Sequence, residues 1–190
     1  MIFVSSDLHL NHDREFVYRP RGFNSIYEMN EAIISRWNEK IQKEDDVYML
    51  GDLALGGGSE DNIEEVAAMV RQLNGTIYWI RGNHDSDARV EKLCQRCENL
   101  ICVGWSYMLH YKKYHFFMTH FPCLTGNLEK ESLHQMTLNI YGHTHQKTNF
   151  YEDRPYMYHC GVDSHDCYPV ALDDIIEEMK EKVMECKELC

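Results

Sequence analysis

The sequence has no long apolar run, no excess of positive charge and no Pro- or Gly-rich linker. No stretch of its 190 residues approaches the run of about twenty apolar residues that crosses a membrane, so we expect no membrane partner. Lys and Arg number 19 against 31 Asp and Glu, a net charge of −12, which disfavours a nucleic acid polymer as partner. The length and the missing linker predict a single domain over residues 1–190.

We also expect no targeting segment. Residues 1–10 already resemble a strand that runs into an Asp and a His, which leaves no room for a charged leader. We therefore interpret the eight cysteines as reduced thiols of a cytoplasmic protein. Cys94 and Cys97 form a CxxC pair, but no second pair stands at the spacing of a structural zinc site, so packing is the preferred role.

The spacing of apolar residues predicts alternating strands and helices. Amphipathic helices are expected over residues 26–41 behind Ser25, over 63–73 behind Ser59, and over 172–183. Strands are expected over residues 2–6, 47–50, 76–80 and 138–141, and a hairpin over 107–111 and 114–119. This alternation predicts an α/β fold with a mixed sheet.

Side chains that can bind metal ions follow the predicted strands. They are Asp7, His9, Asp52, Asn83, His120, His143 and His145. Asp7 and His9 stand two residues apart, as do His143 and His145, and on extended backbone both members of each pair would project to the same side. Oxygen and imidazole ligands without thiolate favour manganese, iron, zinc or nickel.

Each fragment is a weak signal alone, because DxH is common at strand ends and GNHD can be a turn. Together the five blocks resemble, in order, the motifs of the calcineurin-like metallophosphoesterases, and the resemblance spans roughly residues 2–175. The blocks are SDLHLNH from Ser6, LGDLALG from Leu50, IRGNHD from Ile80, MTHFP from Met118 and YGHTHQ from Tyr141. GVDSHDCYPV from Gly161 is similar to the closing strand of small prokaryotic members.

The resemblance implies a two-sheet mixed β-sandwich flanked by helices, in four layers α/β/β/α. It also implies two divalent metal ions that share Asp52, with manganese as the leading candidate. The first ion would be held by Asp7, His9, Asp52 and His145. The second would be held by Asp52, Asn83, His120 and His143.

The implied reaction is hydrolysis of a small phosphomonoester or phosphodiester, such as a nucleotide, by a metal-bridging hydroxide. His84 would donate a proton to the leaving oxygen, and Asp85 could keep it protonated. His12, Arg19 and Arg21 are candidates for binding the phosphate group.

One departure from the family pattern argues against a phosphoprotein as the substrate. Phosphoprotein phosphatases of this superfamily extend the second block to GDxxDR, whereas this chain has Leu55 and Gly56 at those positions. Two alternative functions stay open: a nuclease, which would need a segregated basic surface, and a non-catalytic interaction module. A retromer subunit of this fold serves as a scaffold, but such members typically lose the catalytic His, which this chain retains as His84. The oligomeric state is open.

Overall fold

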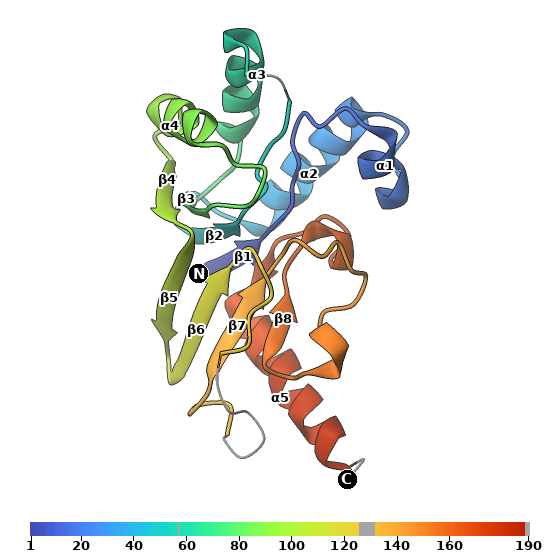
Figure 1. The fold of residues 1–190 in the computed structure, drawn as a ribbon, viewed down its shortest axis with the longest axis vertical. Helices are drawn as coiled ribbons and strands as arrows, with labels where there is room; N and C mark the ends of the chain where they lie inside the picture. The colour runs from blue at the N-terminus through green and yellow to red at the C-terminus, as the bar shows by residue number, and fades with distance from the viewer. Residues whose placement is uncertain (57, 126–131, 189–190) are drawn as a thin grey trace.

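The computed structural model describes residues 1–56, 58–125 and 132–188, and Figure 1 shows two β-sheets with helices around them. The first sheet has the order β4-β3-β2-β1-β9, in which β9 alone is antiparallel to its neighbour. Its strands are β1 (Ile2–Ser5), β2 (Asp46–Leu50), β3 (Thr76–Ile80), β4 (Leu100–Gly104) and β9 (Val170–Ala171).

The second sheet has the order β5-β6-β7-β8, with β5 and β6 antiparallel and the remaining pairs parallel. Its strands are β5 (Ser106–Tyr111), β6 (Tyr114–Thr119), β7 (Thr137–Tyr141) and β8 (Met157–His159). The hairpin between β5 and β6 turns on Lys112, whose φ of 55° lies in the left-handed region. Both sheets are therefore mixed.

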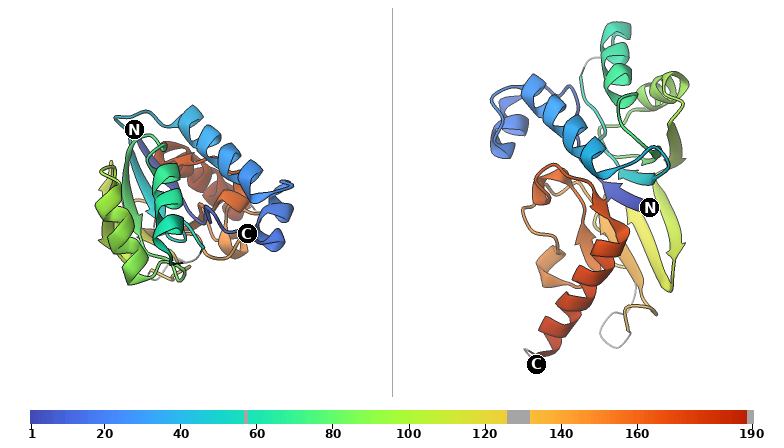
Figure 2. Two further views of the ribbon diagram at one scale, coloured as in Figure 1. Left: turned by 90° about the horizontal axis from the view of Figure 1, so that it is seen from above. Right: turned by 180° about the vertical axis from the view of Figure 1, so that it is seen from behind.

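The described residues form five α-helices. They are α1 (Glu15–Tyr18), α2 (Ile26–Lys40), α3 (Glu60–Val70), α4 (Asp87–Arg96) and α5 (Leu172–Glu188), with 3₁₀ turns η1 (Arg19–Arg21), η2 (Tyr151–Asp153) and η3 (Val162–Ser164). Helix α1 lies beside α2, away from both sheets (Figure 1). Helices α2, α3 and α4 gather on one side of the first sheet, and the second sheet and α5 lie on the other side (Figures 1 and 2).

The two apolar cores follow this layering. One joins the first sheet to α2, α3 and α4 and includes Trp37, Val66 and Trp79. The other joins the facing sides of both sheets to α5, through residues such as Leu50, Phe116 and Ile175. Burial of these side chains is the main force that holds the two sheets in a fixed relation.

Local sequence signals explain where α2 and α3 begin. The hydroxyl of Ser25 accepts a hydrogen bond from the backbone N–H of Glu28 at 3.2 Å, and Ser59 caps Asn62 at 3.3 Å. Helix α3 ends at Val70, three residues before the predicted end, because residues 71–73 form a turn instead. Beyond the predicted elements, the structure has the helices α1 and α4 and the strands β4 and β8. Of these only α4 had a sequence signal, the helical pattern around Cys94 and Cys97.

The predicted fold class is confirmed: two mixed sheets are flanked by helices. The closing strand expected behind Gly161 is β9, which adds antiparallel to β1. Helices long and apolar enough to span a lipid bilayer do not occur in the described part of the chain.

Candidate metal centre

The candidate ligands lie where strands of both sheets end at one edge. Asp7 and His9 follow β1, Asp52 follows β2, Asn83 follows β3, His120 follows β6, and His143 and His145 follow β7. Backbone hydrogen bonds join the loops within each sheet, from the N–H of Asp7 to Gly51 O at 3.0 Å and from Gly142 N to His120 O at 3.0 Å. The N–H of His143 donates to Oδ2 of Asp7 at 2.9 Å and so links the two sheets.

The backbone at these ligands differs from the extended conformation expected. Asp7 and His9 have φ values of 60° and 51°, and His143 and His145 have 68° and 49°. The expectation of extended backbone was therefore wrong, although the paired side chains do converge. Non-glycine residues with positive φ are uncommon and cost free energy, so packing around these loops must hold the conformation in place.

Glycines allow the ligand loops to approach one another. A Cβ atom added to Gly82 would collide with the carboxylate and the backbone nitrogen of Asp52, and one added to Gly142 would collide with Ser6 and Asp7. The glycines in the GNHD and GHTH blocks thus have a steric role as well as a turn-forming one.

Gly82→Ala should therefore lower the free energy of unfolding by about 1–3 kcal/mol, as overpacking of tight sites does. It should also weaken metal binding, since Asp52 would have to move. Gly58→Ala is the matched control, because nothing lies within 4 Å of a Cβ atom there. Urea denaturation of both variants measures the difference, and equal stabilities would contradict the steric role.

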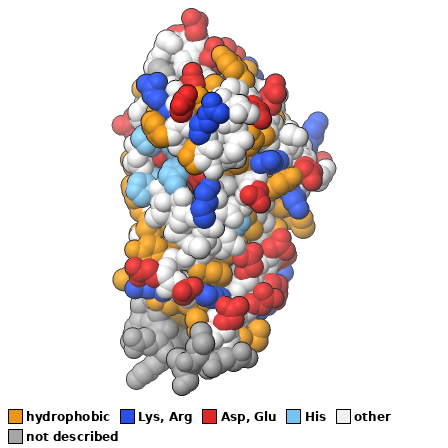
Figure 3. Space-filling model, turned by 90° about the vertical axis from the view of Figure 1, so that its right-hand side faces the viewer, with side chains coloured by type: hydrophobic (Ala, Val, Ile, Leu, Met, Phe, Trp, Pro, Cys, Tyr) orange, Lys and Arg blue, Asp and Glu red, His pale blue; other side chains and the backbone are white. Residues whose placement is uncertain are grey.

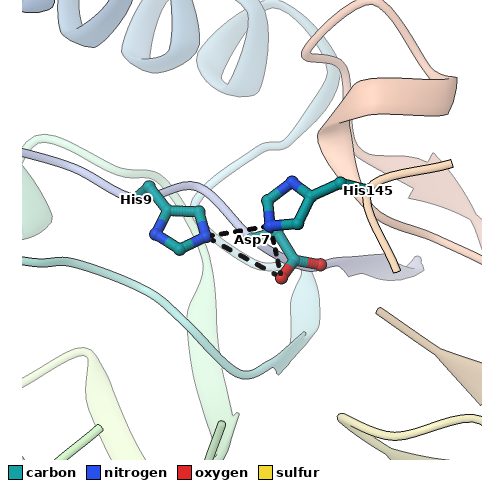
Figure 4. Close-up of side chains that lie close together, drawn as sticks. All are labelled: Asp7, His9 and His145. Carbon is teal, nitrogen blue, oxygen red and sulfur yellow. Dashed lines mark hydrogen bonds and ion pairs between the residues drawn. The ribbon is translucent and has the colours of Figure 1, made fainter. Parts of the chain in front are cut away.

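Asp7, His9 and His145 form the first cluster, in which one ligand atom from each points to a common centre (Figure 4). Nε2 of His9 lies 3.3 Å from Nε2 of His145, and these nitrogens lie 4.0 and 3.8 Å from Oδ1 of Asp7. Burial lowers the pKa of His9 to about 2, which keeps its ring neutral and able to donate an electron pair to a metal.

Asp52, Asn83, His120 and His143 form the second cluster. Nε2 of His120 lies 2.9 Å from Oδ1 of Asn83, 3.2 Å from Nδ1 of His143 and 3.5 Å from Oδ2 of Asp52. Asp7 also lies within reach of Asp52 and His120, so its carboxylate adjoins both clusters, which the sequence did not predict.

Asp52 lies between the two clusters. Its Oδ2 atom is 3.8 Å from Nε2 of His9 in the first cluster and 3.5 Å from Nε2 of His120 in the second. Its other oxygen accepts a hydrogen bond from the backbone N–H of His84 at 3.0 Å. One carboxylate oxygen therefore faces imidazole nitrogens from both clusters.

These residues fit divalent cations. Oδ1 of Asp7 is buried and has no hydrogen-bond donor among the described residues. A buried carboxylate without a partner is costly, and burial raises the pKa of Asp7. A cation bound between Asp7, His9 and His145 would supply the missing partner, and carboxylate with imidazole suits manganese, iron, zinc or nickel.

Hydrogen bonds fix the orientation of two ligand rings. Nδ1 of His120 lies 2.8 Å from the carbonyl oxygen of Leu50, so Nδ1 carries the proton and Nε2 presents its lone pair to the second cluster. Nδ1 of His145 lies 2.7 Å from Oδ2 of Asp163, which likewise turns Nε2 toward the first cluster.

His84 and His12 stand beside the clusters. The His84 side chain is 45% exposed, and its Nε2 atom lies 3.9 Å from Oδ2 of Asp52. The ring of His12 lies 5.3 Å from that of His9 and 6.5 Å from that of His84, centroid to centroid. The structure thus brings both predicted side chains to the open side of the site.

Asp85 has a different position from the one expected. Its Oδ2 atom accepts hydrogen bonds from the backbone N–H groups of Gly82 and Asp52, at 2.7 and 2.8 Å, and from the Trp79 indole at 3.2 Å. None of its hydrogen bonds within the described chain goes to the His84 ring. The interpretation of Asp85 as the group that keeps His84 protonated was therefore wrong; it ties the β2 and β3 loops together.

The expected role of Arg21 in binding phosphate was also wrong. Its side chain is 2% exposed, and its guanidinium donates to Asp163, to the carbonyl oxygens of Asp7 and Leu8, and to the Met29 sulfur. No donor is left for a substrate. Arg19 is exposed, and its guanidinium donates to Oδ1 of Asn24 at 3.0 Å. Its role in binding phosphate stays a prediction.

Sequence reasoning missed Asp163 and Phe121. Asp163 contacts both Arg21 and His145, and its only signal was its place in the segment behind Gly161. Phe121 follows His120, and its ring packs at 5.1 Å against His120 and at 4.8 Å against His143. No motif distinguishes an aromatic residue at that position from an ordinary core residue.

Comparison with known families identifies the chain. The family model of the calcineurin-like phosphoesterase superfamily domain matches residues 1–162. The chain belongs to the calcineurin-like phosphoesterase superfamily. The family resemblance drawn from the five sequence blocks is thereby confirmed, and membership of this superfamily supports phosphoester hydrolysis as the general activity.

Proteins similar to this chain are known from several organisms. An uncharacterized protein of Methanocaldococcus jannaschii is 29% identical over 185 residues, which cover 93% of this chain and 89% of that protein. The Gene 66 protein of Mycobacterium phage D29 is 24% identical over 206 residues and 98% of each chain. The solved structure of a protein of unknown function from Aquifex aeolicus has the same fold, with a TM-score of 0.68, 20% identity, and coverage of 93% of this chain and 98% of that one.

Proposed function

We propose that this protein hydrolyses a phosphomonoester or phosphodiester in a small substrate with the help of two divalent metal ions. The observation that carries the proposal is the position of Asp52, whose Oδ2 atom faces imidazole nitrogens of both clusters at 3.8 and 3.5 Å. A carboxylate placed in this way can be shared by two cations. The exposed His84 ring beside it supplies a group for proton transfer.

The side chains of the two clusters would hold the ions. Asp7, His9, Asp52 and His145 are the proposed ligands of the first, and Asp52, Asn83, His120 and His143 are those of the second. When bound, two such ions lower the pKa of a water molecule toward neutrality, supply the attacking hydroxide and clamp the phosphoryl group for in-line displacement. The ligand set contains oxygen and nitrogen but no thiolate, which suits manganese, iron, zinc or nickel, and manganese is the leading candidate.

His84 is proposed to protonate the leaving oxygen. Its backbone N–H donates to Oδ1 of Asp52, which fixes the start of the side chain next to the shared carboxylate. His12 stands 6.5 Å from His84, ring to ring, and burial lowers its pKa, so a neutral His12 would bind phosphate oxygens by hydrogen bonding. His12 and His84 thus line the side from which substrate enters.

A small substrate is favoured over a polynucleotide by the distribution of charge. Figure 3 shows histidine side chains gathered on one face, with basic and acidic side chains interspersed around them. On the face shown, the described residues form no continuous basic track of the kind that a long phosphate backbone needs. The ring of Phe16, which is 72% exposed and packs on His12 at 5.7 Å, supports a nucleotide, since nucleobases stack on aromatic rings.

Metal-stripped protein, assayed before and after addition of Mn²⁺, tests the proposal. We expect Mn²⁺ to restore turnover of p-nitrophenyl phosphate, bis-p-nitrophenyl phosphate or a nucleotide, and the ratio between them to define the preferred ester. Binding of Mn²⁺ without turnover of any ester would contradict the proposal and favour the non-catalytic interaction module.

A further inference from the structure

We infer that the buried ion pair of Arg21 and Asp163 positions the first cluster, Asp7, His9 and His145, and affects the affinity of that half of the metal centre far more than that of the other half. The inference rests on the proposed two-metal function. The new element is that different hydrogen bonds hold the ligands of the two metal positions in place.

Arg21 supports the backbone that carries two ligands of the first cluster. Its Nη2 atom donates to the carbonyl oxygen of Asp7 at 2.9 Å, and Nη1 donates to that of Leu8 at 3.1 Å. Asp7 and His9 on this stretch have left-handed backbone, which relaxes unless neighbouring groups hold it. Arg21 therefore stabilises the conformation that brings Asp7 and His9 to one centre.

Asp163 supports the third ligand. Its two oxygens accept from Nε and Nη2 of Arg21 at 3.1 and 2.9 Å, and Oδ2 also accepts from Nδ1 of His145 at 2.7 Å. This bond places the proton on Nδ1, leaves Nε2 free for a metal and raises the basicity of the ring. The chain of contacts therefore runs from His145 through Asp163 and Arg21 to the Asp7 loop.

Within the described residues, Asp52, Asn83, His120 and His143 make no direct hydrogen bond to this ion pair, and Asp7 is the one link between the pair and the second cluster. Its central ring, His120, is oriented by the carbonyl oxygen of Leu50, at the end of β2. Asn83 follows β3, and its loop is tied to β2 by the hydrogen bonds of Asp85. Loss of the Arg21–Asp163 pair should therefore leave the Leu50–His120 and Asp85 contacts in place.

Titration of the metal-free protein with Mn²⁺, followed by calorimetry, tests the inference without any substrate. We expect the unmodified protein to bind two ions, and Asp163→Asn to weaken one of them by about 10- to 100-fold while the affinity for the other changes much less. Electron paramagnetic resonance gives a second readout, because neighbouring Mn²⁺ ions couple magnetically. The variant with one equivalent of Mn²⁺ should show the spectrum of an isolated ion.

Arg21→Lys provides a second variant in case Asp163→Asn fails to fold, since lysine keeps the charge but cannot form the fork of hydrogen bonds. It should weaken the same ion. Arg36→Lys is the matched control, because the Arg36 guanidinium donates to the carbonyl oxygen of Asp166 instead of to the ligand loops.

The outcomes separate the inference from the function on which it rests. Equal weakening of both ions, or unchanged affinity of both in Asp163→Asn and Arg21→Lys, would overturn the inference while the two-metal function stands. Fewer than two Mn²⁺ ions bound by the unmodified protein would overturn the proposed function itself.

Discussion

Asp52→Asn should remove both metal ions and with them the hydrolytic activity. The amide keeps the size of the side chain, but it replaces a charged oxygen that lies within 4 Å of His9 and His120 by a neutral group. Loss of an outer partner of a metal ligand already costs about 10- to 100-fold in affinity or activity, and a shared ligand should cost more, at both positions. Metal analysis of the purified variant together with an Mn²⁺ titration measures the effect.

Asp46→Asn is the matched control, because Asp46 lies at the opposite end of the same strand, β2. It should keep both ions and full turnover. Retention of one tightly bound ion by Asp52→Asn would show that Asp52 belongs to a single metal position, and that Asp7, which also adjoins both clusters, connects them instead.

His84→Ala should lower turnover by about 10²- to 10⁴-fold, the range for loss of a general acid, while both metal ions stay bound. The His84 ring lies beside the clusters and is 45% exposed, and only its backbone N–H bonds to Asp52. Alanine keeps that N–H, so the position of Asp52 should not change. Comparison of kcat with the amount of bound Mn²⁺ separates the two effects.

An ester with a better leaving group sharpens this test. Because a good leaving group needs no proton, His84→Ala should lose less activity on p-nitrophenyl phosphate than on an alkyl phosphate. His110→Ala controls for the loss of an exposed histidine, since His110 stacks on His115 in the β5–β6 hairpin. Equal losses on both esters would contradict the role of proton donor and leave His84 as a substrate-binding group.

Local patterns were sufficient to predict much of the fold. Ser25 and Ser59 cap helices as predicted, and the apolar spacing behind them marks the buried faces of α2 and α3. These features depend on residues three or four positions apart, which the sequence displays directly. Strands of two or three residues were harder to find from local pattern, because they owe their existence to partners distant in the sequence. Strand β8 was not predicted, and β9 was expected only from the family resemblance.

In the candidate site, too, some features are visible in the local sequence and others depend on residues distant in the chain. Five short blocks were enough to select the residues that gather at one edge of the two sheets, since the chemistry of Asp, Asn and His after a strand is visible in the sequence. Which backbone conformation brings them together was not visible. Contacts with Arg21 and the β2 loop, which the sequence does not display, support the left-handed φ values of Asp7 and His9.

By itself the sequence determined the family, the fold class and the set of candidate ligands, because each rests on local pattern and residue chemistry. Tertiary structure alone decided which charged groups face the site and which support it. Arg21 and Asp85 carry charges suited to catalysis, yet both side chains are buried and form hydrogen bonds to the ligand loops. Asp163 lies 18 positions from His145 in the chain, and only folding brings its carboxylate to that ring.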